Sequence, residues 1–137
     1  MTPCVTFPGA SLSFAISFAC SSPAAAFLFS DALVITGLIS DEELATRSSI
    51  GFYLFAPRGE NERLLEQAGF HLLQTVDTTI SAAGIAKRRY DGRARRQSIL
   101  LPIEGQTNFE GLQRFLARVH ILTREQRLSR FLYLASK

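Results

Sequence analysis

The 137-residue chain contains only two cysteines, Cys4 and Cys20, and they form no disulfide framework. A chain of this size buries a core without disulfides, so a secreted disulfide scaffold is excluded and a reducing compartment is favoured. Neither cysteine has metal-ligand spacing, and His71 and His120 lie far apart with no neighbouring cysteine or paired carboxylate. The sequence therefore predicts a cytoplasmic protein without a metal site.

Charge is almost absent from the start of the chain, because residues 1–30 carry no Asp, Glu, Lys or Arg. A signal peptide needs a basic region before its apolar run, and none is present. Serines and Pro23 also interrupt the apolar run short of the ~20 residues that a membrane-spanning helix requires. We therefore expect no membrane segment. Apolar side chains alternate with small residues over Leu12–Cys20, which predicts a half-buried strand.

The remaining charge is unevenly distributed. Residues 41–80 hold seven acids and three bases, whereas residues 81–137 hold twelve bases and four acids. Six of these bases crowd the segment Lys87–Arg96. Such a segment is typical of a solvated helix face or a helical lid, and it is also compatible with binding to nucleic acid phosphates. We favour the first interpretation, because Tyr90 is the one aromatic residue interleaved with these bases.

Hydrophobic periodicity predicts an alternation of strands and helices after residue 24. A continuous apolar run predicts a first strand that is buried on both faces. Ser40 and Glu43 have the spacing of a capping box, which predicts a helix that runs to about Ser49. The full expectation is strands over 24–35, 70–78 and 130–135, and helices over 40–49, 60–69, 80–101 and 108–125. This order predicts an α/β fold.

The segments FLFSDA (27–32), GFYLFAPRGENERLLEQAGFHLLQTVD (51–77) and LSRFLYLASK (128–137) resemble the carboxyl-terminal half of class I S-adenosylmethionine-dependent methyltransferases. The resemblance covers residues 25–137 and leaves residues 1–23 as an unmatched apolar segment. It implies a single domain over 24–137 with a partial Rossmann-like sheet of three to four strands. The last strand would be antiparallel and lie between the other two, and flanking helices and a helical insertion would complete the domain.

Two features of that family have no counterpart here. Its first four strands are absent, and no G-x-G occurs among the nine glycines, although only glycine lets backbone amides approach a cofactor so closely. The resemblance implies S-adenosylmethionine as cofactor, but we expect a truncated methyltransferase that is inactive alone. The strand predicted at Leu12–Ala19 would pair with residues 26–34, or else leave an exposed sheet edge through which two copies dimerise.

The candidate substrate-binding residues lie near the first strand and in the segment after the capped helix. They are Asp31, Arg47, Ser49, Phe52, Tyr53, Phe55 and Asn61. Asp31 is expected at the carboxyl end of its strand, where α/β sheets bind ligands, and the aromatic residues would enclose a small-molecule methyl acceptor. Alternatively, the aromatic residues form core and the polar residues cap helices. The competing functions are a non-catalytic α/β interaction module and a nucleic-acid binder.

Overall fold

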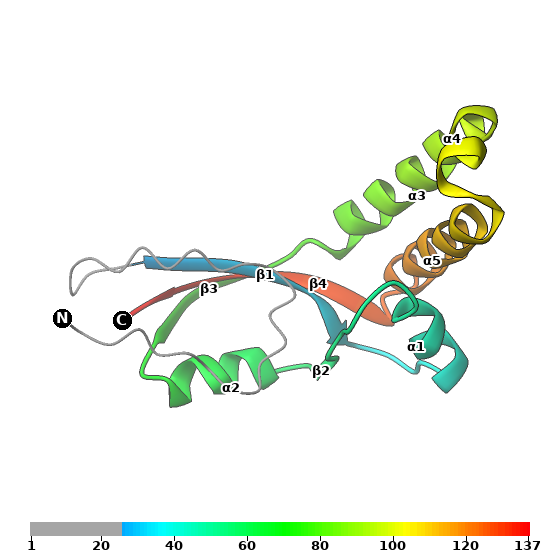
Figure 1. Cartoon of the computed structure of the whole chain (residues 1–137). Helices are drawn as coiled ribbons and strands as arrows, with labels where there is room; N and C mark the ends of the chain where they lie inside the picture. Colours follow the sequence, from blue (N-terminus) through cyan, green and yellow to red (C-terminus); the bar gives the residue numbers. More distant parts are fainter. Residues whose placement is uncertain (1–25) are drawn as a thin grey trace.

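The computed structural model of the chain describes residues 26–137, and a mixed sheet lies at its centre (Figure 1). The four strands are β1 (Ala26–Ile35), β2 (Ala56–Pro57), β3 (His71–Asp77) and β4 (Leu128–Ser136), in the spatial order β2-β1-β4-β3. β4 pairs antiparallel with both of its neighbours, whereas β1 and β2 are parallel. The predicted α/β fold is confirmed, as is the prediction of an antiparallel last strand between the other two.

In Figure 1, α2 (Glu60–Gln67) lies apart from the other helices, beneath one face of the sheet. α1 (Asp41–Arg47) lies near the carboxyl end of β1, beside α5 (Gln106–Arg124). A helical arm, made of α3 (Thr79–Arg95), α4 (Gln97–Glu104) and α5, projects away from the sheet. Within residues 26–137 no helix has both the length and the apolar character to cross a membrane.

The helical arm differs from the expectation of one helix over 80–101. α3 ends at Arg95, and Arg96 both closes α3 and precedes α4. The Arg96 amide donates to the Arg93 carbonyl oxygen over 3.0 Å, which is the tighter three-residue step of a closing turn. The prediction of a continuous helix is therefore wrong, because the chain turns here before α5 packs back along α3.

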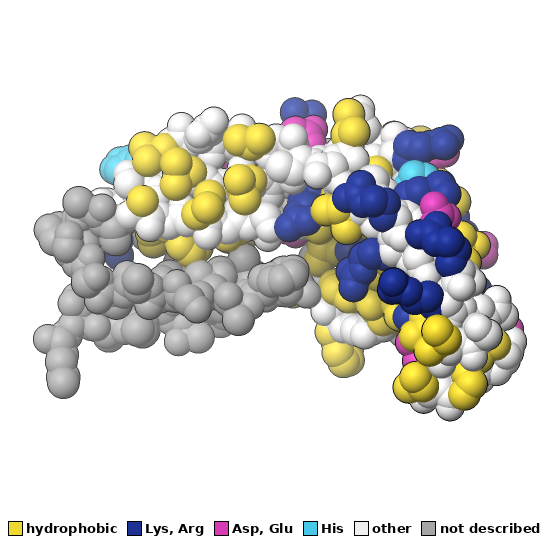
Figure 2. Space-filling view, turned by 90° about the horizontal axis from the view of Figure 1, so that it is seen from above, with side chains coloured by type: hydrophobic (Ala, Val, Ile, Leu, Met, Phe, Trp, Pro, Cys, Tyr) yellow, Lys and Arg dark blue, Asp and Glu magenta, His cyan; other side chains and the backbone are white. Residues whose placement is uncertain are grey.

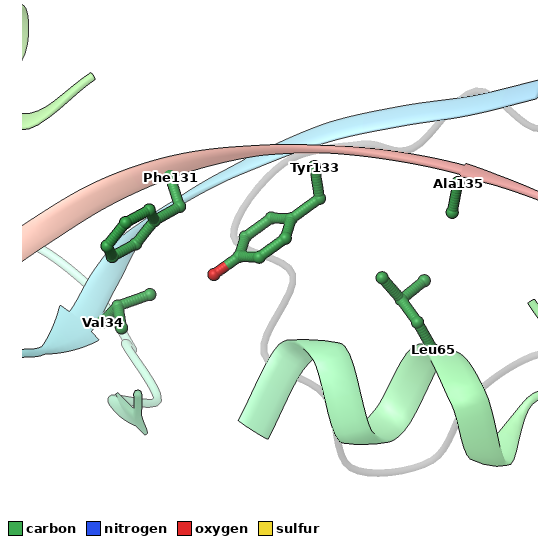
Figure 3. Close-up of a cluster of buried hydrophobic side chains, with 5 residues drawn as sticks. All are labelled: Val34, Leu65, Phe131, Tyr133 and Ala135. Carbon is green, nitrogen blue, oxygen red and sulfur yellow. The ribbon is translucent and has the colours of Figure 1, made fainter. Parts of the chain in front are cut away.

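One hydrophobic core lies between α2 and the sheet. Leu65 of α2 packs against a cluster of four buried side chains on β1 and β4 (Figure 3), namely Val34, Phe131, Tyr133 and Ala135. Phe27, Phe29, Phe70 and Leu72 surround this cluster. Leu28 points to the opposite face and is 60% exposed. The prediction that β1 is buried on both faces is therefore wrong, because α2 covers only one face of this strand.

The capping box predicted at α1 is confirmed, and it belongs to a larger ionic network. The Glu43 amide donates to Ser40 Oγ, and the Ser40 amide donates to Glu43 Oε2. The same carboxylate binds Arg127 Nη1 at 2.7 Å and Arg118 Nη1 at 3.1 Å. Hydrogen bonds from Arg127 and Ser40 are the main causes that lower the pKa of Glu43 to about 2. The network fixes α1 against α5 and the turn before β4.

The strand predicted at Leu12–Cys20, its pairing with residues 26–34 and the alternative of a dimerising edge all depend on residues outside the described range. They stay predictions.

Candidate functional site

Asp31 lies inside β1, four residues before the end of the strand at Ile35, and so not at the carboxyl end that we expected. Its Oδ1 accepts a hydrogen bond from the Leu33 amide over 2.8 Å. The pairing of β1 with β4 shifts register between Asp31 and Val34. The strand continues past this acidic residue because the Asp31 carboxylate accepts from the Leu33 amide where the pairing with β4 is irregular.

Asn61 connects Asp31 to the middle of β4. Its side-chain amide donates to Asp31 Oδ2 over 2.8 Å and to the Tyr133 hydroxyl over 3.4 Å. Asn61 lies in the first turn of α2, which begins directly after Gly59, whose φ of 89° is in the left-handed region that favours glycine. We call Asp31, Asn61 and Tyr133 the polar cluster.

Tyr133 is the buried member of the polar cluster, with only 1% of its surface exposed. Its ring stacks on Phe29 with centroids 4.9 Å apart, and Figure 3 shows its side chain on the α2 side of the sheet. Burial is the main cause that raises the pKa of the Tyr133 hydroxyl to about 12, with smaller contributions from Glu62 and Asp31. The hydroxyl therefore stays protonated at neutral pH and can donate a hydrogen bond.

Arg47, the last residue of α1, is only 7% exposed and lies between two aromatic rings. Its guanidinium carbon is 4.9 Å from the ring centroid of Tyr53 and 5.0 Å from that of Phe115. Burial lowers the pKa of Arg47, and interactions with Tyr53 and with the charge of Asp31 oppose that shift. The charge of Arg47 is therefore influenced by Asp31 of the polar cluster.

The other predicted site residues lie elsewhere. Ser49 is exposed and donates to the Thr46 carbonyl oxygen over 2.8 Å, as expected of a residue that closes a helix. Phe52 is fully exposed, and Phe55 is half-buried just before β2. The structure thus brings together Asp31, Arg47, Tyr53 and Asn61. Sequence reasoning missed Tyr133 and Phe115, because each looks like an ordinary core aromatic at an apolar position.

Neither a metal nor a nucleotide-type cofactor fits the described residues. Within residues 26–137 no group of three or more His, Cys, Asp or Glu side chains could hold a metal ion. Gly37 and Gly59 each lie between a strand and the helix that follows it. A Cβ added at Gly59 would meet no atom within 4 Å, and one added at Gly37 would meet Arg127 Cα at 3.0 Å, so the close approach at Gly37 is to the chain itself and not to an open cradle. The full sequence also contains no G-x-G. These residues therefore lack the glycine-rich turn that S-adenosylmethionine requires in the resembled family.

Basic side chains gather over the helical arm, as Figure 2 shows. Lys87 pairs with Asp91, and Arg93 pairs with Glu104. Four other arginines of this segment form no ion pair with a residue of the described range, namely Arg88, Arg89, Arg95 and Arg96. At ~100° per residue Arg88, Arg89 and Arg95 fall within about 120° of the circumference of α3, and Arg96 follows directly at the end of that helix. We call these four arginines the arginine face.

Comparison with known proteins identifies the fold. No protein-family model and no curated protein matches the chain. Among solved structures it is similar to a Galdieria sulphuraria protein, which is named a candidate sarcosine dimethylglycine methyltransferase, with a TM-score of 0.71 and 16% sequence identity. The chain has a methyltransferase-like, partial Rossmann fold. The match covers 84% of this chain but only 42% of that protein, so this chain spans less than half of its length.

Proposed function

We propose that this chain supplies the acceptor-binding side of a small-molecule methyltransferase that uses S-adenosylmethionine. The polar cluster carries the proposal. Asp31 is held by the Leu33 amide on one oxygen and by Asn61 on the other, each at 2.8 Å. A carboxylate offers about four lone-pair positions, so two remain for a ligand. An acceptor amine could therefore donate to a carboxylate that is already fixed in place.

The name of the Galdieria protein suggests the kind of acceptor. Sarcosine and dimethylglycine are small amino acids with an amine and a carboxylate. The amine would lie against Asp31, since a fixed polar group orients a nucleophile before reaction. Tyr53 would exclude water beside them. The methyl donor would depend on a glycine-rich turn supplied by another polypeptide, so we expect no methyl transfer by the purified chain alone.

Sarcosine binding tests the role of Asp31. In isothermal titration, Asp31→Asn will weaken sarcosine binding by about 10- to 100-fold, because one charge-assisted hydrogen bond contributes about 1.5–3 kcal/mol. The asparagine oxygen still accepts from the Leu33 amide, but its nitrogen cannot accept from Asn61, so circular dichroism of the variant checks that the fold is retained. Asp77→Asn is the matched control, because Asp77 accepts from the amide two residues on in the same way, over 2.8 Å, on β3. Equal sarcosine affinity for Asp31→Asn and the unchanged chain would refute the proposed site.

The arginine face supports a second candidate function, a module that binds an acidic partner. Four clustered charges attract a polyanion strongly at low salt, and the attraction falls as salt screens it. Replacing Arg88, Arg89, Arg95 and Arg96 with glutamine should abolish binding to fluorescent polyglutamate in an anisotropy titration at 50 mM salt. Replacing Arg63 and Arg124, which lie elsewhere, serves as the control. Equal binding by both variants would exclude this function.

A further inference from the structure

Arg47 carries a buried positive charge that lacks its full set of hydrogen bonds. The side chain is 7% exposed, and neither Nε nor Nη1 has a hydrogen-bond partner. The guanidinium carbon lies 4.9 Å from the ring centroid of Tyr53 and 5.0 Å from that of Phe115, and a hydrogen bond with the Tyr53 side chain also supports the charge. Nε and Nη1 stay without a partner among residues 26–137. Asp31 attracts this charge at longer range, but its hydrogen-bonded partners are Leu33 and Asn61.

A buried guanidinium with unpaired N–H groups destabilises the fold unless another group compensates its charge. A buried charge without hydrogen bonds is expensive, and proteins normally pair buried arginines with a carboxylate or phosphate. Arg93 and Arg127 each form such a pair, whereas no ion pair joins Arg47 to another residue of the range 26–137. The unused donors of Arg47 therefore suit an acid group that residues 26–137 do not provide.

We propose that Arg47 is the anion-binding residue of the acceptor site and that the acceptor carries a carboxylate. This inference rests on the proposed function and extends it, because Asp31 and Arg47 would hold opposite ends of one zwitterionic molecule. A carboxylate fits better than a phosphate, since Asp31 lies close enough for its charge to act on Arg47 and would repel a doubly charged group more strongly.

The segment that carries Tyr53 provides a route for the ligand. Between α1 and β2 the chain forms neither helix nor strand, and Ile50 and Phe52 are 49% and 105% exposed. Phe115, by contrast, is anchored on α5. Movement of the Tyr53 segment would open one side of Arg47 without disturbing the helical arm. The exposed apolar side chains would then be available to cover a bound acceptor.

Thermal unfolding with a minimal acid tests this inference. Acetate at tenfold excess over its Kd will raise the Tm of the unchanged chain by about 5 °C, and acetamide at equal ionic strength will not. Arg47→Met will show no acetate response. Its Tm without ligand will equal or exceed that of the unchanged chain, because an apolar residue replaces an uncompensated buried charge. Arg63→Met, on the exposed surface of α2, will keep the full acetate response.

Three results would overturn the inference. They are no acetate response in the unchanged chain, an unaltered response in Arg47→Met, or a response to inorganic phosphate alone. If Arg47→Met fails to fold, NMR on the unchanged chain decides: acetate, but not acetamide, will shift the Arg47 Nε–H resonance, which Arg47→Lys identifies by its loss. Acetate has no amine, so Asp31→Asn will keep the acetate response. A failed acetate test of Arg47 would therefore not affect the sarcosine test of Asp31.

Discussion

Tyr133→Ala will lower the free energy of unfolding by about 3–5 kcal/mol, because truncating a buried aromatic side chain leaves a cavity that the surroundings fill only in part. Tyr133 is 1% exposed at the centre of the sheet, and it contacts the rings of Phe29 and Phe131 at centroid distances of 4.9 and 6.2 Å. Urea denaturation followed by circular dichroism measures the change.

Two companion variants separate packing from hydrogen bonding. Tyr133→Phe keeps the ring and removes the hydroxyl, so it should cost only about 1 kcal/mol. Leu28→Ala, on the exposed face of β1, should change the free energy of unfolding by less than about 0.5 kcal/mol. A loss below about 1 kcal/mol for Tyr133→Ala would contradict the position of this residue in the core.

The Tm of the chain should fall steeply in acid as the Glu43 network breaks. The pKa of Glu43 is about 2 in the folded chain, against an ordinary value of 4.5. A lowered pKa means that the carboxylate stabilises the fold fully above about pH 4.5. That contribution is lost as the pH falls toward 2. Glu43→Gln should lower the Tm at pH 7 and flatten its dependence on pH between 4.5 and 2.

Glu66→Gln is the matched control for Glu43→Gln, because Glu66 is exposed on α2. It should leave both the Tm at pH 7 and its acid dependence unchanged. A Glu43→Gln variant with the same acid profile as the unchanged chain would show that Arg127 and Arg118 do not hold this carboxylate in solution.

Local sequence signals predicted the elements well where one residue pattern decides the outcome. The capping box at Ser40 and Glu43 fixed the start of α1, since both of its hydrogen bonds form within four residues. Gly69, with a φ of 80°, marked the end of α2. The order of the strands came from the family resemblance, because no local pattern states that β4 lies between β1 and β3.

The candidate site was only partly predictable, for a physical reason. Asp31 stands out in the sequence because it interrupts an apolar run, whereas Asn61 lies between two glutamates. Their 2.8 Å contact depends on how α2 packs on the sheet. Tyr133 and Phe115 were missed because burial alone explains an aromatic residue at an apolar position. The exposure of Phe52 was equally hidden, since hydrophobicity does not reveal which side of an irregular segment faces the solvent.

An NMR titration of the ¹⁵N-labelled chain tests the central claim most directly, with sarcosine and S-adenosylmethionine added to separate samples. The account predicts that sarcosine shifts the Leu33 amide, the Asn61 side-chain amide and the Arg47 Nε–H signals, and that S-adenosylmethionine shifts none of them. Shifts caused by S-adenosylmethionine at micromolar concentration, or a sarcosine titration that leaves these three signals in place, would contradict an acceptor-binding role for this chain.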